Sequence, residues 1–132
     1  WNDIFGLVGG GSYSQVRTSN IGGEVHHMPA NSINGLGHGS GPAIHMTSAD
    51  HAQTASFKNM SGARDFRTKQ AQHIANKRFD KAMKMDILDI KAKTKSGAIK
   101  NDYSQSMGEA VDRALKKKLI TDAQHRKLKK LA

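Results

Sequence analysis

The sequence predicts a small α+β fold, in which a β-hairpin and one short helix are followed by a mainly helical basic region. Two short apolar segments lie on either side of a glycine-rich loop between residues 24 and 46. After residue 57, apolar residues recur at the three- to four-residue spacing of amphipathic helices. The 132-residue chain has no cysteine, which excludes disulfides and thiolate metal sites.

The chain is most simply one domain over residues 13–132, preceded by a linker or tail at residues 1–12. The tail combines a short apolar start with a glycine run, which is typical of a linker. Residues 13–20 suit a short strand or a turn. We expect the hairpin and helix to occupy about residues 22–57, and the basic helices to occupy residues 58–132.

Residues 24–28 alternate in the manner of a short strand. This alternation separates two adjacent histidines: His26 shares a face with Glu24, and His27 lies on the opposite face. Residues 30–41 then form a glycine-rich loop, and residues 43–46 form a second strand.

A short helix is expected next, capped by Thr47 or Ser48 and with Asp50 in its first turn. His51 would also lie in that turn and point back at the strands. The later helices are predicted at about residues 61–77, 79–95, 103–114 and 122–131. Thr121 and Gln124 form a capping box at the start of the last one.

Charge divides the chain into two unequal parts. Residues 1–56 contain one basic and three acidic residues, whereas residues 57–132 contain 20 basic and eight acidic residues. The net charge of +10 favours a polyanionic partner such as nucleic acid. Charge does not distinguish DNA from RNA, and we take DNA over RNA as the leading interpretation. No apolar run approaches the roughly 20 residues of a membrane-spanning helix.

Four of the seven histidines lie in the two strand segments and the helix start. A nuclease can use such a cluster to hold one divalent metal ion and to deprotonate a water molecule with an imidazole. We assign His26 and His51 to the metal and His27 to the general base, with Asp50 or Glu24 as a further ligand. This ligand set favours Zn²⁺, with Ni²⁺ or Mg²⁺ as alternatives.

Other polar residues near the cluster have supporting roles in this interpretation. His45, Ser48 and Thr54 are candidates for orienting the ligands or binding phosphate. Asp86 and Asp89 are expected to be solvated rather than metal-binding.

The segments EVHHMPA at residues 24–30 and GPAIHMTSADHAQTAS at residues 41–56 carry a family resemblance. They resemble the HNH/endonuclease VII superfamily, the treble-clef or ββα-metal nucleases. More narrowly, they are similar to the C-terminal nuclease domains of bacterial polymorphic toxins of the contact-dependent inhibition or Rhs type. One departure is that Gly41-Pro42-Ala43 stands where the family's middle Asn braces the loop.

The resemblance implies that His26 and His51 bind the metal and that His27 is the base. It also implies a toxin delivered as the C-terminal part of a larger surface or secreted protein, which acts in the cytoplasm of a target bacterium. A cognate immunity protein, expected to be acidic, would block it in the producing cell.

Two alternatives to a metal-dependent endonuclease remain at this point. A ribonuclease, perhaps directed at tRNA, would use His27 with His45 or His51 as a metal-free acid–base pair. A basic module that binds nucleic acid without cutting it would use the histidines only for structure.

Overall fold

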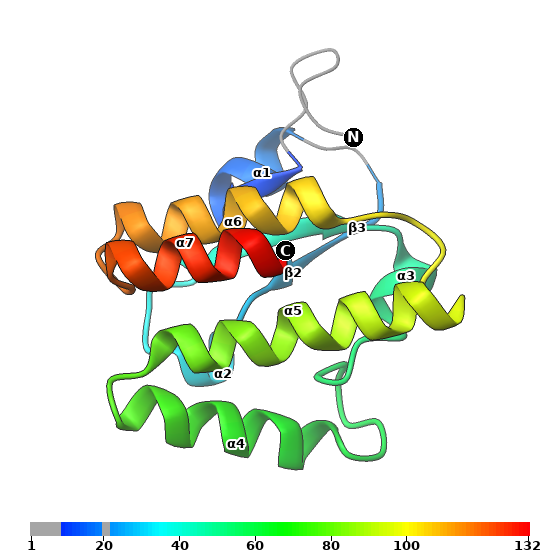
Figure 1. Cartoon of the computed structure of the whole chain (residues 1–132). Helices are drawn as coiled ribbons and strands as arrows, with labels where there is room; N and C mark the ends of the chain where they lie inside the picture. The colour runs from blue at the N-terminus through cyan, green and yellow to red at the C-terminus, as the bar shows by residue number, and fades with distance from the viewer. Residues whose placement is uncertain (1–8, 20–21) are drawn as a thin grey trace.

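The computed structural model describes residues 9–19 and 22–132. Within these ranges short strands alternate with short helices up to residue 51, and four longer helices follow (Figure 1). The elements are β1 (Gly10–Ser12), α1 (Tyr13–Ser19), β2 (Glu24–His27), α2 (Asn31–Asn34), β3 (Pro42–Met46), α3 (Ser48–His51), α4 (Ala63–Ala75), α5 (Phe79–Ser96), α6 (Ser104–Lys116) and α7 (Asp122–Leu131). The predicted α+β class is confirmed.

The three strands form an antiparallel sheet in the order β1-β3-β2. β3 lies in the centre and is buried along its whole length. The strand order makes β2 an edge strand, and no second strand pairs with it within the described ranges. His26 pairs with Ile44 of β3, and Val25 pairs with His45. Because paired residues share a face, His45 lies on the same face as Val25, opposite to His26.

The apolar core lies where the sheet meets α5, α6 and α7, which cover it in Figure 1, with α4 packed outside α5. Ile44 and Met46 of β3 face Met83, Ile87 and Ile90 of α5 in one buried cluster. The stripe on α5 follows from its three- to four-residue spacing, which puts these side chains on one side of the helix.

The N-terminal residues differ from the prediction. Residues 10–12, expected to belong to the linker, form the buried strand β1, and residues 13–19 form a helix rather than a strand or turn. A β-carbon on Gly10 would lie 2.0 Å from the carbonyl oxygen of Ser106, so glycine is what allows β1 to lie against α6. The remaining predicted linker residues lie outside the described ranges.

The predicted helices are confirmed with small shifts at their ends. The capping box of Thr121 and Gln124 is present at the start of α7. α4 begins after Gly62, without a side-chain cap, rather than at Ser61. One helical turn, α2, lies inside the predicted glycine loop. None of the helices in the described ranges is long and apolar enough to cross a bilayer.

Two neighbouring residues of α5 test the position of the core. Ile87 is fully buried, whereas Leu88 is 44% exposed. Ile87→Ala should lower the free energy of unfolding by about 2–5 kcal/mol, because it removes buried methyl groups and leaves a cavity. Leu88→Ala should change it by less than about 0.5 kcal/mol. Urea denaturation measures both, and equal losses would contradict this packing.

Candidate active site

Glu24, His26 and His51 form a cluster on one face of the sheet. Alternation along β2 directs Glu24 and His26 to the same face, as predicted. Nδ1 of His51, from α3, is hydrogen-bonded to Oε1 of Glu24. The rings of His26 and His51 lie 5.1 Å apart between their centroids. Two separate segments of the chain therefore bring two imidazoles and one carboxylate together.

The Glu24 contact fixes the tautomer of His51. A carboxylate only accepts hydrogen bonds, so Nδ1 of His51 carries the proton and Nε2 keeps its lone pair in the neutral ring. This hydrogen bond also lowers the pKa of Glu24, against the opposing effect of partial burial. The side chains of His51 and Glu24 are 19% and 41% exposed, so this end of the cluster is open to solvent.

His51 is placed by the short helix α3. The hydroxyl of Thr47 accepts a hydrogen bond from the Asp50 backbone at 3.2 Å, which caps the helix as predicted. The carboxylate of Asp50 points away from the cluster, where it accepts hydrogen bonds from the backbone N–H of Lys100, from Asn101 and from Tyr103. Glu24 rather than Asp50 is thus the carboxylate that lies at the histidines.

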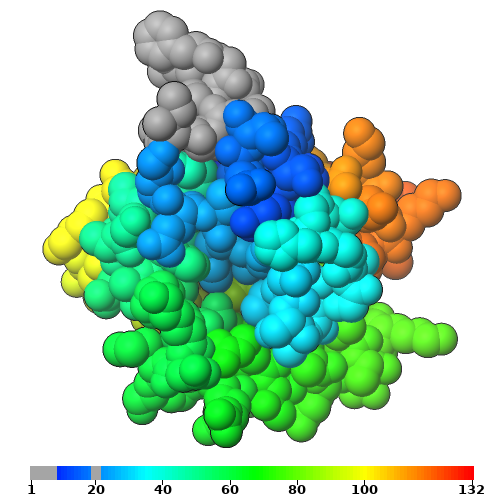
Figure 2. Space-filling view, turned by 180° about the vertical axis from the view of Figure 1, so that it is seen from behind, coloured from blue at the N-terminus to red at the C-terminus, as the bar shows by residue number. Residues whose placement is uncertain are grey.

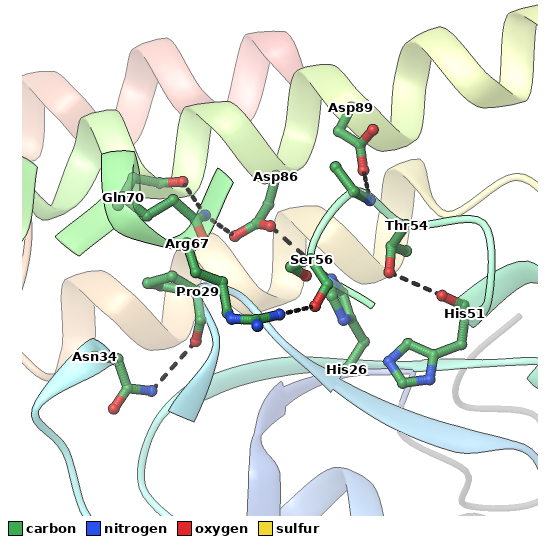
Figure 3. Close-up of polar contacts among 12 residues, drawn as sticks. His26, Pro29, Asn34, His51, Thr54, Ser56, Arg67, Gln70, Asp86 and Asp89 are labelled. Atoms are coloured by element: carbon green, nitrogen blue, oxygen red, sulfur yellow. Dashed lines mark hydrogen bonds and ion pairs between the residues drawn. The ribbon is translucent and has the colours of Figure 1, made fainter. Parts of the chain in front are cut away.

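His26 is the buried member of the cluster, with 4% of its surface exposed. Burial holds its pKa at about 3, and the nearby His51 and His27 add to the effect, so the ring is neutral at pH 7. Its Nε2 atom has no hydrogen-bond partner among the described residues and lies 4.0 Å from Oδ1 of Asp86 (Figure 3).

Asp86 is buried, which corrects the expectation that it is solvated. It is 2% exposed, and its Oδ2 accepts a hydrogen bond of 2.8 Å from the amide of Gln70 on α4. Burial raises its pKa well above the usual range, and this effect outweighs the opposing one of the Gln70 bond. Asp89 is also tied to the protein, through the Ala55 backbone and Lys93.

His27 lies on the opposite face of β2. Its ring stacks on Tyr13 of α1, with centroids 4.3 Å apart, and its Nε2 donates to the His38 carbonyl at 3.0 Å. Since a carbonyl only accepts, the neutral ring keeps a free lone pair on Nδ1. Burial lowers the pKa of His27, against the opposing effect of this bond. The three predicted catalytic histidines therefore do not converge on one point.

The other predicted residues have local contacts. Nε2 of His45 donates to the Gly22 carbonyl at 2.8 Å, on the face opposite to His26. The hydroxyl of Thr54 donates to the His51 carbonyl at 2.8 Å and so supports the end of α3. Ser48 is next to Glu24, where its hydroxyl helps to lower the pKa of that carboxylate.

An asparagine braces the loop between β2 and β3, although it precedes the position where the family resemblance places one. Asn34 is buried, donates to the Pro29 carbonyl at 3.3 Å and accepts from the Leu36 backbone at 2.9 Å. The Asn34-Gly35 pair, with Gly35 at φ 72°, is a turn signal that could have identified it.

Positive charge near the cluster is limited. The guanidinium of Arg67 donates to the carbonyls of Ser56 and Lys58, and Lys58 also acts on Glu24. On the face shown in Figure 2, the blue atoms that follow α1 lie between the cyan loop and the green segment that contains α3. Farther from the cluster, five cations line a groove between α5 and α7: Arg78, Lys81, Lys84, Lys127 and Lys130.

No protein-family model matches the chain, and neither the curated proteins nor the solved structures compared with it give a match.

The donor chemistry of the cluster suits a borderline divalent metal ion, because His26 and His51 are imidazoles that bind in the neutral form. Within the described ranges, however, no three His, Asp or Glu side chains are grouped closely enough to hold an ion together. The described residues therefore offer at most two protein ligands, His26 and His51, and the remaining positions on an ion would be left to water or substrate.

Burial of His26 makes stability depend on pH. Its pKa is about 3 in the folded protein and near 6.5 in an unfolded chain, so only the unfolded state takes up a proton between these values. The stability contributed by the neutral ring is therefore complete above about pH 6.5 and is lost as pH falls towards 3, with a slope approaching ~1.4 kcal/mol per pH unit.

Metal-free wild-type protein and His26→Gln should show this in urea denaturation across that pH range. The wild type should lose stability relative to the variant as the pH falls. Asp86 acts in the opposite sense, because its raised pKa gives stability that is lost as pH rises. Because Asp86 faces residue 26, the comparison also includes His26→Gln in the Asp86→Leu background, where the Asp86 term is absent. Parallel curves in that pair would contradict the burial of a neutral His26.

Proposed function

We propose that the protein is a metal-dependent endonuclease that hydrolyses phosphodiester bonds, with DNA as the preferred substrate. The observation that carries this proposal is the meeting of His26, His51 and Glu24 from two separate segments. A buried, neutral histidine beside a second, solvent-accessible one is costly to maintain for structure alone, but it is suited to binding a metal ion.

His26 and His51 would hold the ion, and Glu24 would keep Nε2 of His51 available by binding Nδ1. When bound, a Zn²⁺ ion would neutralise charge on the phosphate and the leaving oxygen; Ni²⁺ and Mg²⁺ are alternatives. The open side at His51 and Glu24 is where a phosphodiester can approach.

His27 is the proposed general base. The His38 carbonyl fixes the proton on Nε2, so Nδ1 can accept a proton from water. Stacking on Tyr13 restricts rotation of the ring. His27 and His26 project from opposite faces, but β2 is an edge strand. A phosphodiester lying along the free side of that strand can therefore meet side chains from both faces.

The biological setting in this proposal is that of a toxin delivered into a target bacterium and blocked by an acidic immunity protein in its producer. The charge of +10 supports both a nucleic-acid substrate and fast association with an acidic protein.

A second candidate is a metal-free ribonuclease. His27 and His38 lie with ring centroids 5.2 Å apart, and Tyr13 contacts both rings. Two imidazoles at this separation can act as an acid–base pair on the 2′-hydroxyl of RNA. Here His38 replaces the predicted partners His45 and His51, because His51 lies on the other face and His45 is bonded to Gly22.

Plasmid DNA and total RNA, each incubated with the protein with and without EDTA, distinguish these functions. The proposed endonuclease should cut plasmid DNA, lose at least about 100-fold of its rate in EDTA, and regain it with Zn²⁺, Ni²⁺ or Mg²⁺. Cleavage of RNA alone, undiminished by EDTA, would instead establish the ribonuclease. If the protein binds nucleic acid in a salt-sensitive manner but cuts neither substrate with any of the three metals, the non-enzymatic binding module would be supported instead.

Substitutions separate the roles of the two faces. His27→Ala should slow cleavage by about 10²–10⁴-fold while Zn²⁺ binding is retained, because it removes only the base. His51→Ala should lose Zn²⁺ binding together with activity. His73→Ala, in α4 and outside both groups of histidines, is the matched control and should behave like the wild type. Loss of Zn²⁺ binding in His27→Ala would contradict this division.

A further inference from the structure

A row of three polar side chains crosses the apolar core behind the cluster. His26 comes from β2, Asp86 from α5 and Gln70 from α4, and all three are at least 95% buried. Figure 3 shows Gln70 and Asp86 in line with the imidazole of His26. Of these three residues, the proposed function uses only His26.

The row leaves two buried atoms without a hydrogen-bond partner among the described residues, Oε1 of Gln70 and Nε2 of His26. The amide nitrogen of Gln70 donates to Oδ2 of Asp86 at 2.8 Å and to the Ala82 carbonyl at 2.9 Å, which fixes the carboxylate. The other oxygen, Oδ1, faces Nε2 of His26 across 4.0 Å. That nitrogen is buried, and no group in the described part of the chain forms a hydrogen bond with it.

The surroundings make this arrangement unfavourable for packing alone. Asp86 lies on the apolar stripe of α5, one turn from Ala82 and one turn from Ile90, and both of these are fully buried. An apolar side chain at this position would continue the stripe without the cost of burying a carboxyl group. A carboxyl group at this position therefore points to a polar role, and His26 is the polar side chain that its Oδ1 faces.

We infer that Asp86, held by Gln70, is the positioning residue of His26. The ring donates its Nε2 proton towards Oδ1, and a bridging water or a shift of about 1 Å closes the 4.0 Å gap. This contact fixes the proton on Nε2 and leaves the Nδ1 lone pair free as the metal donor. The second part of this inference rests on the proposed function, whereas the first concerns the metal-free protein alone.

Asp89 provides a matched comparison on the same helix. Its carboxylate accepts from the Ala55 backbone at 2.8 Å and pairs with Lys93 at 2.8 Å, so it ties down a neighbouring segment without facing the His26 ring. If a substitution acted only by loosening the packing of α5, changes at Asp86 and at Asp89 should have similar effects on His26. If Asp86 positions His26, only the change at Asp86 should affect that ring.

The first measurement uses protein labelled with ¹⁵N at histidine, without metal, at neutral pH. The ring nitrogen shifts report which atom carries the proton. The wild type and Asp89→Asn should hold His26 with the proton on Nε2. Asp86→Leu should lose this preference. Asp86→Asn should move the proton to Nδ1, because its oxygen accepts from Gln70 and its NH2 group then faces Nε2 of His26 as a donor. A wild type with the proton on Nδ1, or an unchanged Asp86→Leu, would overturn the inference.

The second measurement is calorimetric titration with Zn²⁺. Removing the partner of a ligating histidine typically costs 10–100-fold in affinity. Asp86→Leu should weaken Zn²⁺ binding by that factor, and Asp89→Asn should not. If Asp86→Leu does not fold, Gln70→Met, which releases the carboxylate, should weaken binding in the same direction by a smaller factor. Unchanged affinity in the folded variant tested would overturn the role in metal binding.

These measurements also separate the two proposals. A wild type that binds no Zn²⁺ and cuts neither nucleic acid would refute the proposed function, while the ring-nitrogen measurement would still decide whether Asp86 positions His26. A wild type that binds and cuts, with Asp86→Leu indistinguishable from it in both readouts, would refute the inference alone.

Discussion

The buried carboxylate of Asp50 is the contact on which the histidine cluster depends. It joins α3 to the connection between α5 and α6 through Lys100, Asn101 and Tyr103, with donor–acceptor distances of 2.7–2.8 Å. The hydrogen bonds outweigh the effect of burial and lower the pKa of Asp50, so the group is held as an anion. Because His51 is the next residue, its position beside Glu24 is set by residues about fifty positions later in the chain.

The two faces of β2 are built in different ways. On one face His26 is enclosed by helices that come late in the sequence and has a buried carboxyl group behind it. On the other, His27 is held by Tyr13 and the His38 carbonyl, both close to the surface. Adjacent residues with the same side chain therefore receive opposite environments, and this difference can give one a ligand role and the other an acid–base role.

The sequence predicted the elements whose signals are periodic or chemical, but it could not predict contacts made across the fold. Helical spacing located α4 to α7, and strand alternation separated His26 from His27. β1 was missed because Gly10 and Gly11 have no side chain that could show alternation. Asp86 was taken for a surface residue on its charge, although its place between Ala82 and Ile90 on the stripe indicates burial.

The exposed lysines of α5 lie on the side of the helix away from the histidine cluster, so they are placed to attract a polyanion from a distance but not to contact one bound at His51. Asp86 faces His26, so Lys81, Lys84 and Lys91 lie on the opposite side of the helix, where they are exposed. A helix with its side chains is about 10 Å across, and the Debye length at physiological salt is about 8 Å. These lysines are thus largely screened from a phosphate at His51, where Lys58 is the nearer cation. In the proposed function, most of the charge of +10 would therefore act on the approach of the nucleic acid, and the histidine cluster would hold the phosphate largely by itself.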